Sequence, residues 1–214
     1  MSAREDILAR IGSALRDAPQ APAIPRSYRR GPAMNAQQRL EQLVDRLKDY
    51  KANVAVVAAE AAGDTVAALL AGAASVAVPA GLPPGYLKAL ASATDDGGAP
   101  TVLIDSPEQA LTTAELDRVD AVVTAAAVAV SETGTIILDG AADQGRRAIS
   151  LVPDRHICLL TAEQIVEVLP EAIARLDQSR PQTWISGPSA TSDIELERVE
   201  GVHGPRRLDV VILT

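Results

Sequence analysis

Residues 53–79 read "NVAVVAAEAAGDTVAALLAGAASVAVP" and contain two apolar runs separated by a helix-like segment. The runs are "NVAVVAA" and "ASVAVP", and the segment between them is "AGDTVAALLAGA". Strands that are apolar throughout are typical of parallel sheets with both faces buried, and a helix between two such strands provides the crossover. The segment therefore predicts a strand–helix–strand unit with a right-handed connection.

The same alternation continues toward the C-terminus. "PPGYLKALAS" predicts a helix, "TVLID" a strand, "TAELDRV" a short helix and "DAVVTAA" a strand. Residues 126–139 form a hairpin-like section, "AISLVPDRHICLL" continues as strand material, and "TAEQIVEVLPEAIARL" predicts a helix capped by Thr161. "QTWIS" and "RLDVVIL" predict the last strands. The fold class is therefore α/β, a single domain with a mostly parallel central sheet covered by helices.

An N-terminal helical arm precedes this domain. "SAREDILARIGSAL" predicts a helix, with a capping box of Ser2 and Glu5 and one apolar face. The proline-rich residues 17–33 predict an extended tether, because proline donates no backbone hydrogen bond. A second helix begins at Asn35. We therefore divide the chain into the arm, residues 1–34, and the domain, residues 35–214.

Composition excludes several classes of protein. The net charge of −8 and the lack of a basic stripe argue against a nucleic-acid partner. Cys158 is the only cysteine, so the chain cannot hold an iron–sulfur cluster or form an internal disulfide, and we expect no cofactor in it. No uncharged apolar run is long enough for a membrane span, and the charged start "MSAREDILAR" is not a signal peptide. These features predict a cytoplasmic protein.

Two polar segments in the middle of the chain are candidate sites. In "SETGT", Ser131 and Thr133 supply hydroxyls, Glu132 a carboxylate, and Gly134 permits a sharp turn. The segment ends an apolar strand, where open α/β sheets place ligands, although an ordinary hairpin turn has the same composition. In "DGAADQGRRAIS", Arg146 and Arg147 could bind a carboxylate or phosphate in bidentate fashion, or could be surface charges.

A third candidate is "SGPSATSDIELERVEGVHGP", residues 186–205. Hydroxyls near its start could cap a short helix beginning near Asp193, whose backbone amides would bind an anion. A metal site built from Asp193, Glu195 and His203 matches no strong metal motif, so we predict no metal. The candidate ligand-binding residues of this segment are Gly187, Ser189, Thr191 and Glu195.

The segments "SETGTIIL", "QGRRAISLVPDRHICLL" and "WISGPSATSDIELERVEGVHGPRRLDVVIL" resemble the LUD-domain family, in particular its lactate utilization protein C branch. The resemblance implies a fold similar to the NagB/RpiA/CoA-transferase-like proteins. It also implies partner subunits with iron–sulfur clusters, in a system that oxidises L-lactate to pyruvate. "SETG" further resembles a segment that carries the catalytic glutamate of some CoA transferases, which corresponds here to Glu132.

The function implied by the resemblance is that of a cluster-free subunit of an L-lactate utilization system. Its pocket would be formed by residues 131–135, 186–195 and 201–206, with residues 186–205 folding back against the turn at 131–135 at the carboxyl ends of the central strands. A small organic acid would bind Arg146, Arg147 or Arg206, and the catalytic residues would be Glu132, Asp193 and His203. Two alternatives stay open: a non-catalytic assembly or regulatory subunit, and a stand-alone transferase or ligase acting on an acyl or phosphorylated molecule.

Overall fold

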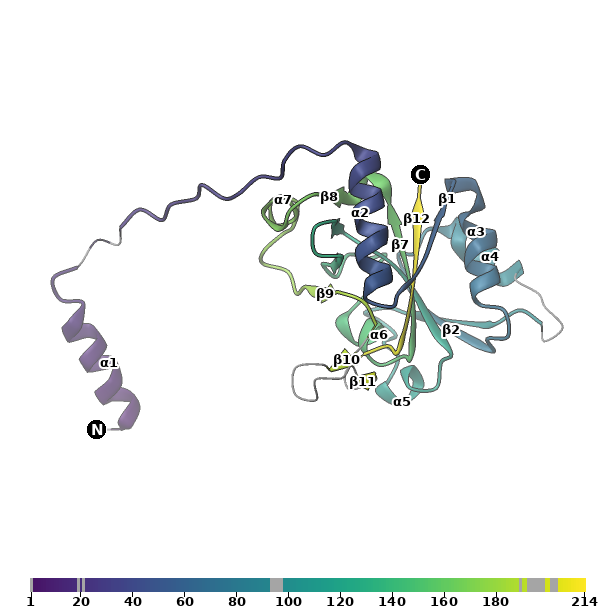
Figure 1. Cartoon of the computed structure of the whole chain (residues 1–214). Coiled ribbons are helices and arrows are strands. Elements are labelled where there is room, and N and C mark those ends of the chain that lie inside the picture. The colour runs from purple at the N-terminus through teal and green to yellow at the C-terminus, as the bar shows by residue number, and fades with distance from the viewer. Residues whose placement is uncertain are drawn as a thin grey trace.

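The fold is described from a computed structural model, which describes residues 2–18, 20, 22–92, 98–188, 190–191, 199–200 and 204–214. A six-stranded parallel sheet forms the centre, in the order β1-β12-β7-β4-β2-β3 (Figure 1). The strands are β1 (Asn53–Val57), β2 (Ser75–Pro79), β3 (Thr101–Asp105), β4 (Ala121–Ala125), β7 (Arg155–Thr161) and β12 (Arg207–Leu213). The predicted fold class is confirmed.

One face of the central sheet is covered by α3 (Ala62–Leu69) and α4 (Pro84–Ser92). Val66 of α3 and Leu90 of α4 pack with Val76 and Val78 of β2 in one buried cluster. Residues 53–79 thus form β1, a 3-10 turn (Ala59–Ala61), α3 and β2, as the sequence predicts. However, β1 is an edge strand and only partly buried, because one side of it lacks a neighbouring strand.

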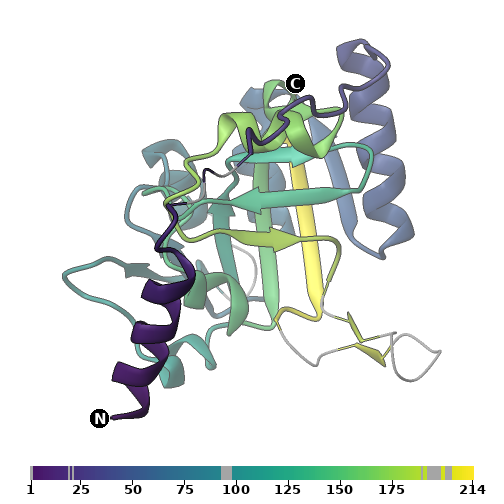
Figure 2. The same ribbon diagram turned by 90° about the vertical axis from the view of Figure 1, so that its left-hand side faces the viewer.

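The other face packs against a small second sheet and α2 (Ala36–Asp49). This sheet has the order β8-β5-β6-β9, with strands β5 (Val128–Val130), β6 (Thr135–Leu138), β8 (Ile165–Val166) and β9 (Thr183–Ile185). Figure 2 shows its strands running across those of the central sheet. β5 and β6 pair antiparallel, which confirms the predicted hairpin at residues 126–139. Leu43 and Leu47 of α2 fill the space between the sheets.

Two predictions of secondary structure are wrong. "AISL" belongs to the helix α6 (Arg147–Leu151) and not to a strand. Residues 161–176 do not form one helix; they contain a 3-10 turn (Ala162–Gln164), β8 and then α7 (Leu169–Arg175). Ile165 pairs with Ala129 of β5, which extends the chain there, and Pro170 is tolerated only in the first turn of a helix.

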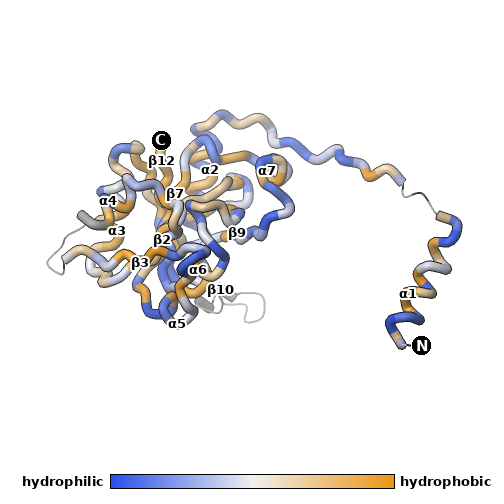
Figure 3. The backbone as a smooth tube through the Cα atoms, turned by 180° about the vertical axis from the view of Figure 1, so that it is seen from behind, coloured by the Kyte–Doolittle hydropathy of each residue, from blue (hydrophilic) through white to orange (hydrophobic). Residues whose placement is uncertain are grey.

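The remaining elements are short. Thr112 caps α5 (Thr113–Leu116) in a capping box with Glu115. β10 (Ala190–Thr191) and β11 (Val199–Glu200) pair antiparallel. Figure 3 shows that the central strands are hydrophobic and that the chain around α6 is hydrophilic. Within the described residues, no helix combines the length and the apolar character needed to cross a bilayer.

The arm begins with α1 (Ala3–Ala14), whose predicted capping box of Ser2 and Glu5 is present. Figure 1 shows α1 standing clear of the domain, and none of its side chains is buried. The end of the arm behaves differently, since Arg29 and Met34 contact the domain. The division at residue 34 stays a prediction.

Candidate functional site

A pocket of about 640 Å³ lies at the carboxyl edge of the central sheet. Its walls are the residues that follow β2 and β3, the segment 139–147 and the start of β9. The Gly81 N–H donates to the Ala142 carbonyl (2.9 Å), and the Ala125 N–H donates to the Asp143 carbonyl (2.9 Å). These bonds hold the segment 139–147 against the edge where parallel α/β sheets bind their ligands.

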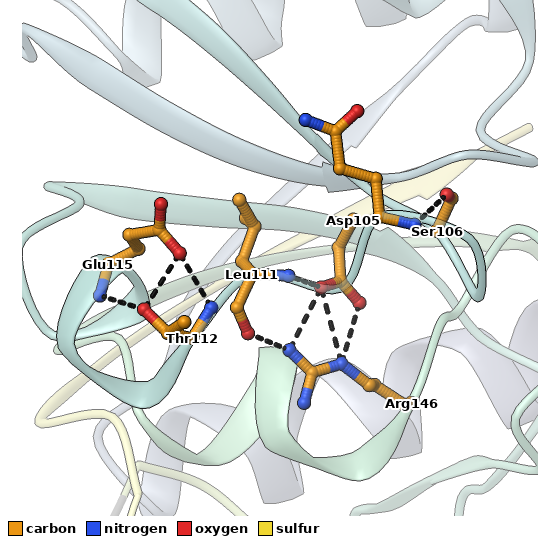
Figure 4. A network of polar contacts seen from close by, with 7 residues as sticks. Asp105, Ser106, Leu111, Thr112, Glu115 and Arg146 are labelled. Atoms are coloured by element: carbon orange, nitrogen blue, oxygen red, sulfur yellow. Dashed lines mark hydrogen bonds and ion pairs between the residues drawn. The ribbon is translucent and has the colours of Figure 1, made fainter.

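An ion pair between Asp105 and Arg146 forms one wall of the pocket (Figure 4). Asp105 ends β3, is 4% exposed, and accepts from Arg146 Nε (3.0 Å) and Nη2 (2.9 Å) and from the Leu111 N–H (2.8 Å). The hydrogen bond to Asp105 is the main cause of the raised pKa of Arg146. The charge of Arg146 is therefore balanced within the chain, and this arginine braces the loop after β3.

Arg147, its neighbour, is an exposed lining residue of the same pocket. Among the residues that the structure describes, no carboxylate pairs with its guanidinium. Arg180, which also lines the pocket, donates to Asp139 Oδ2 (3.4 Å) and to the Gly140 carbonyl (2.9 Å). Of these three arginines, Arg147 is the one whose charge is available to an anion, and a guanidinium can hold a carboxylate through two parallel hydrogen bonds.

The turn at residues 131–135 lies at the opposite end of β6 from the pocket. Its hydroxyls bond within the chain: Ser131 Oγ donates to Gln42 Oε1 of α2 (2.8 Å), and Thr133 bonds to Thr135 (2.8 Å). Gly134 has φ of +63°, and a Cβ there would lie 2.7 Å from Cβ of Arg46. The turn therefore packs closely on α2, and the predicted binding residues in it do not share the pocket with Arg146 and Arg147.

Glu132 of this turn forms an ion pair with Arg29 of the arm, with 2.5 Å between Oε2 and Nη2. This hydrogen bond lowers the pKa of Glu132. Nearby, Glu167 is 4% exposed and accepts from the Met34 N–H (2.9 Å). A Cβ at Gly31 would lie about 2 Å from the Glu167 carboxylate, so this approach requires glycine. Residues 29–34 thus form a strap over the two glutamates.

The loop at residues 186–206 leaves β9 beside the turn and enters β12. Ser186 Oγ lies 2.9 Å from Thr135 Oγ1, and Gly187 packs against Tyr50. At the other end, Arg206 pairs with Asp154 (2.6 Å), immediately before β12 and β7 begin. The prediction that residues 201–206 lie at the carboxyl ends of the central strands is therefore wrong for Arg206, because the loop feeds the first residue of a parallel strand.

Several predicted residues cannot be placed. Ser189, Asp193, Glu195 and His203 lie outside the described residues, and Thr191 is described only as part of β10. Within the described part of the chain, no three His, Cys, Asp or Glu side chains gather as metal ligands. The site formed by Asp193, Glu195 and His203 thus stays a hypothesis.

His156 and Cys158 are buried in β7. Thr124 Oγ1 lies 2.8 Å from His156 Nε2, and burial lowers the pKa of His156 to about 4. Burial raises the pKa of Cys158 to about 12, so this thiol stays protonated at neutral pH. Clusters are held by several cysteine thiolates, and this single buried thiol does not fit one.

Sequence reasoning missed Asp105, Glu167 and Arg180. Asp105 had a usable signal, because it directly follows the apolar run "TVLI" and so ends a predicted strand. The sequence contains no such local signal for Glu167 or Arg180, because their partners are distant in the sequence or are backbone groups.

The LUD domain model matches residues 40–213. This chain belongs to the LUD domain family. It is 51% identical over 178 residues to lactate utilization protein C of Deinococcus radiodurans, a match that covers 81% of this chain and 79% of that one. Shorter matches include lactate utilization protein C of Bacillus licheniformis, 30% identical over 42% of this chain and 41% of that one. Escherichia coli YkgG, described as uncharacterized, is 34% identical over 39% of each chain.

A solved structure supports the same family. The crystal structure of a DUF162 family protein from Deinococcus radiodurans matches with a TM-score of 0.68 and 41% sequence identity. The match covers 85% of this chain and 100% of that one.

Proposed function

We propose that this LUD-domain chain is a subunit of a system that oxidises L-lactate to pyruvate, with iron–sulfur clusters in the other subunits. The observation that carries the proposal is the 51% identity to lactate utilization protein C of Deinococcus radiodurans, across 81% of the chain. The cytoplasm is the expected location of such a system.

The pocket at the carboxyl edge supports this proposal. L-lactate has one carboxylate, and Arg147 places at the wall of the pocket a guanidinium that has no carboxylate partner among the described residues. Ser150 also lines the pocket, but it is 2% exposed and its hydroxyl donates to the Arg147 carbonyl (3.3 Å), so it helps to position Arg147. We therefore assign the carboxylate of lactate to Arg147, while Arg146 stays paired with Asp105.

Oxidation of lactate to pyruvate removes two electrons and two protons, one proton from the carbon that bears the hydroxyl and one from the hydroxyl oxygen. Cys158 does not fit a cluster, so in this proposal the electrons pass to groups carried by partner chains. A volume of about 640 Å³ exceeds what lactate fills, which leaves room for such a group beside the substrate. Glu132 is paired with Arg29 away from this pocket, whereas a proton-transfer role of Asp193 or His203 stays a prediction.

The volume of the pocket also favours a second candidate function. A transferase or ligase acting on an acyl or phosphorylated molecule would need a pocket of this size, since pockets for drug-sized ligands have volumes of about 300–1,000 Å³. In that case Arg147 would bind the phosphate or carboxylate of the larger ligand.

Calorimetric titration of L-lactate into the chain tests the binding site. Replacing Arg147 by Ala should weaken binding at least about tenfold, because a charge-assisted bidentate contact is lost. Arg147→Lys should recover part of the affinity, and Arg118→Ala, at another exposed arginine, should change nothing. Equal affinities of Arg147→Ala and the unchanged chain would refute the pocket assignment.

Lactate oxidation by the co-purified complex tests the role itself. Subunits encoded next to this chain should be isolated with it, and the rate of lactate-dependent dye reduction should be measured with and without the chain. We expect omission of the chain to abolish oxidation and Arg147→Ala to raise KM. Full activity without the chain would reject the role in lactate oxidation, whatever the calorimetry shows.

A further inference from the structure

Half of the exposed large apolar side chains in the described residues belong to the arm. Twelve such side chains are exposed, and six of them lie within residues 1–34: Ile7, Leu8, Ile11, Leu15, Ile24 and Tyr28. The four that belong to α1 or directly follow it are each at least 50% exposed. Exposed apolar residues in such a concentration are typical of an interaction surface.

The four side chains form one stripe. Ile7, Ile11 and Leu15 are spaced by four residues, and Leu8 lies beside them, so all four project from one face of the helix. No residue of α1 is buried by the domain of its own chain. Isolated helices of this length are marginally stable in water, so α1 needs a surface that covers the stripe.

The strap determines where α1 can reach. Arg29 is held by Glu132, and the Met34 N–H is held by Glu167, which follows β8. The free part of the arm thus begins near Tyr28, and Figure 1 shows it leaving the domain on the side of α7 and β8. The strap therefore directs α1 away from the opposite flank of α2, where β1 lies.

A groove on that opposite flank has the complementary chemistry. It has a volume of about 430 Å³ and lies between α2 and β1. Leu40, Val44 and Val56 line it with apolar surface, and Val56 is 44% exposed although it belongs to a strand. Glu41 and Asp45 supply two acidic side chains at the same groove and Lys48 one basic side chain, so its lining has a net charge of −1.

Charge is distributed unevenly between the arm and the domain. Residues 1–34 contain six arginines and three acidic residues, a net charge of +3. Residues 35–214 contain 14 basic and 25 acidic residues, a net charge of −11. The arm is thus attracted to the domain of any copy of this chain, and opposite potentials accelerate and orient such an association.

We propose that α1 of one copy docks in the groove between α2 and β1 of a second copy, and that the exchange is reciprocal. The apolar stripe covers Val44 and Val56 of the partner copy, and Arg10 faces Glu41 and Asp45. The product is an arm-exchanged dimer with two equivalent contacts. This inference is independent of the lactate proposal.

Sedimentation equilibrium of the full chain tests the exchange. We expect a dimer, and a dissociation constant at least tenfold higher for the double variant Ile7→Glu/Ile11→Glu. Ile24→Glu, at an exposed position of the arm outside α1, is the control and should leave the dimer intact. Circular dichroism should show the same folded domain in all variants, because none of these side chains is buried and each is at least 50% exposed.

Exchanging the charges of Arg10 and Glu41 tests whether α1 docks in this groove. Arg10→Glu and Glu41→Arg should each weaken the dimer, and the double variant Arg10→Glu/Glu41→Arg should restore it. The proposal fails if the unchanged chain is monomeric at micromolar concentration, including a monomer whose α1 is protected from hydrogen exchange by its own domain. It also fails if the dimer survives Ile7→Glu/Ile11→Glu, or if the arm binds anionic lipid vesicles and forms no dimer.

Discussion

The two edges of the central sheet use charged residues differently. At the amino edge, buried Asp209 is surrounded by partners: Asn53 Nδ2 (2.9 Å), Arg155 Nε (2.7 Å) and Arg207 Nε (3.2 Å). At the carboxyl edge, Asp105 is surrounded in the same way by Arg146 and Leu111, but Arg147 stands beside this pair without a carboxylate among the described residues. The amino edge uses its charges to join strands, whereas the carboxyl edge has an exposed guanidinium at the wall of a pocket.

The two edges suggest a physical criterion that separates structural from functional arginines: whether the charge is already paired within the chain. A charge that is already compensated inside the chain gains little from a ligand, because binding must first break the existing pair. An unpaired charge at a pocket has no existing pair to break, so the full free energy of its contact with the ligand contributes to binding. By this criterion Arg155 and Arg146 are structural, and Arg147 is the residue to test for function.

The largest loss of stability should come from Asp209→Ala at the amino edge. Asp209 is 1% exposed, and its removal leaves the guanidinium of Arg155 largely buried without its partner. Losing one partner of a buried pair costs about 3–5 kcal/mol, so we expect a fall of at least about 3 kcal/mol in the free energy of unfolding. Urea denaturation measures it, with Asp49→Ala as the exposed control. A change below about 1 kcal/mol would mean that this network does not stabilise the edge.

The next effect depends on pH and concerns His156, the second residue of β7. Burial lowers its pKa from 6.5 to about 4, so the unfolded chain takes up this proton at a higher pH than the folded chain does. The contribution of neutral, buried His156 to the free energy of unfolding is fully present above pH 6.5. It is lost as the pH falls from 6.5 toward 4, where the unfolded chain binds the proton and the folded chain does not. The loss amounts to about 3 kcal/mol at most.

Urea denaturation between pH 7 and pH 4 measures this contribution by comparing the chain with His156→Gln. Carboxylates titrate in both proteins, so the difference between the two curves isolates His156. We expect the stability of the unchanged chain to fall more steeply below pH 6.5. Parallel curves would show that His156 is protonated as easily in the folded state as in the unfolded one.

A smaller effect is expected from Asp105→Asn at the carboxyl edge. The substitution keeps the volume of the side chain but removes the charge that balances Arg146. Because the Arg146 side chain is 41% exposed, water compensates part of the loss, and we expect a destabilisation of about 2 kcal/mol. Denaturation measures it, with Asp139→Asn at the longer Arg180 pair (3.4 Å) for comparison. If Asp105→Asn leaves the stability unchanged, Arg146 is available to a ligand just as Arg147 is.

The arrangement of the sheet was predictable because its signals are local. Apolar runs such as residues 75–79 alternate with helical segments, and this pattern leads to the observed β1–α3–β2 unit. Residues 161–176 were not predictable in this way. Ile165 becomes a strand only because it pairs with Ala129, which is 36 residues earlier in the chain, and no local pattern reports such a pairing.

The candidate site was predictable only in part. The pair Arg146 and Arg147 was recognised from the sequence, and both residues line the pocket. The contact of Arg29 with Glu132 spans 103 residues and has no local signal. The position of Arg206 follows from topology: in an all-parallel sheet, a loop that directly precedes a strand must reach the amino edge, so the last part of residues 186–206 could have been placed there.

The smallest effect is expected from Arg206→Ala, and it tests the comparison of the two edges most directly. Arg206 and Asp154 are 63% and 57% exposed, and such surface pairs contribute little to stability because water screens them. The hydrogen bond to Arg206 lowers the pKa of Asp154, so the pair persists throughout the neutral range. We therefore expect Arg206→Ala to leave the affinity for L-lactate unchanged in the calorimetric titration that detects the loss in Arg147→Ala. If Arg206→Ala instead weakens binding as strongly as Arg147→Ala, the ligand reaches the amino edge, and the loop at residues 186–206 belongs to the binding site.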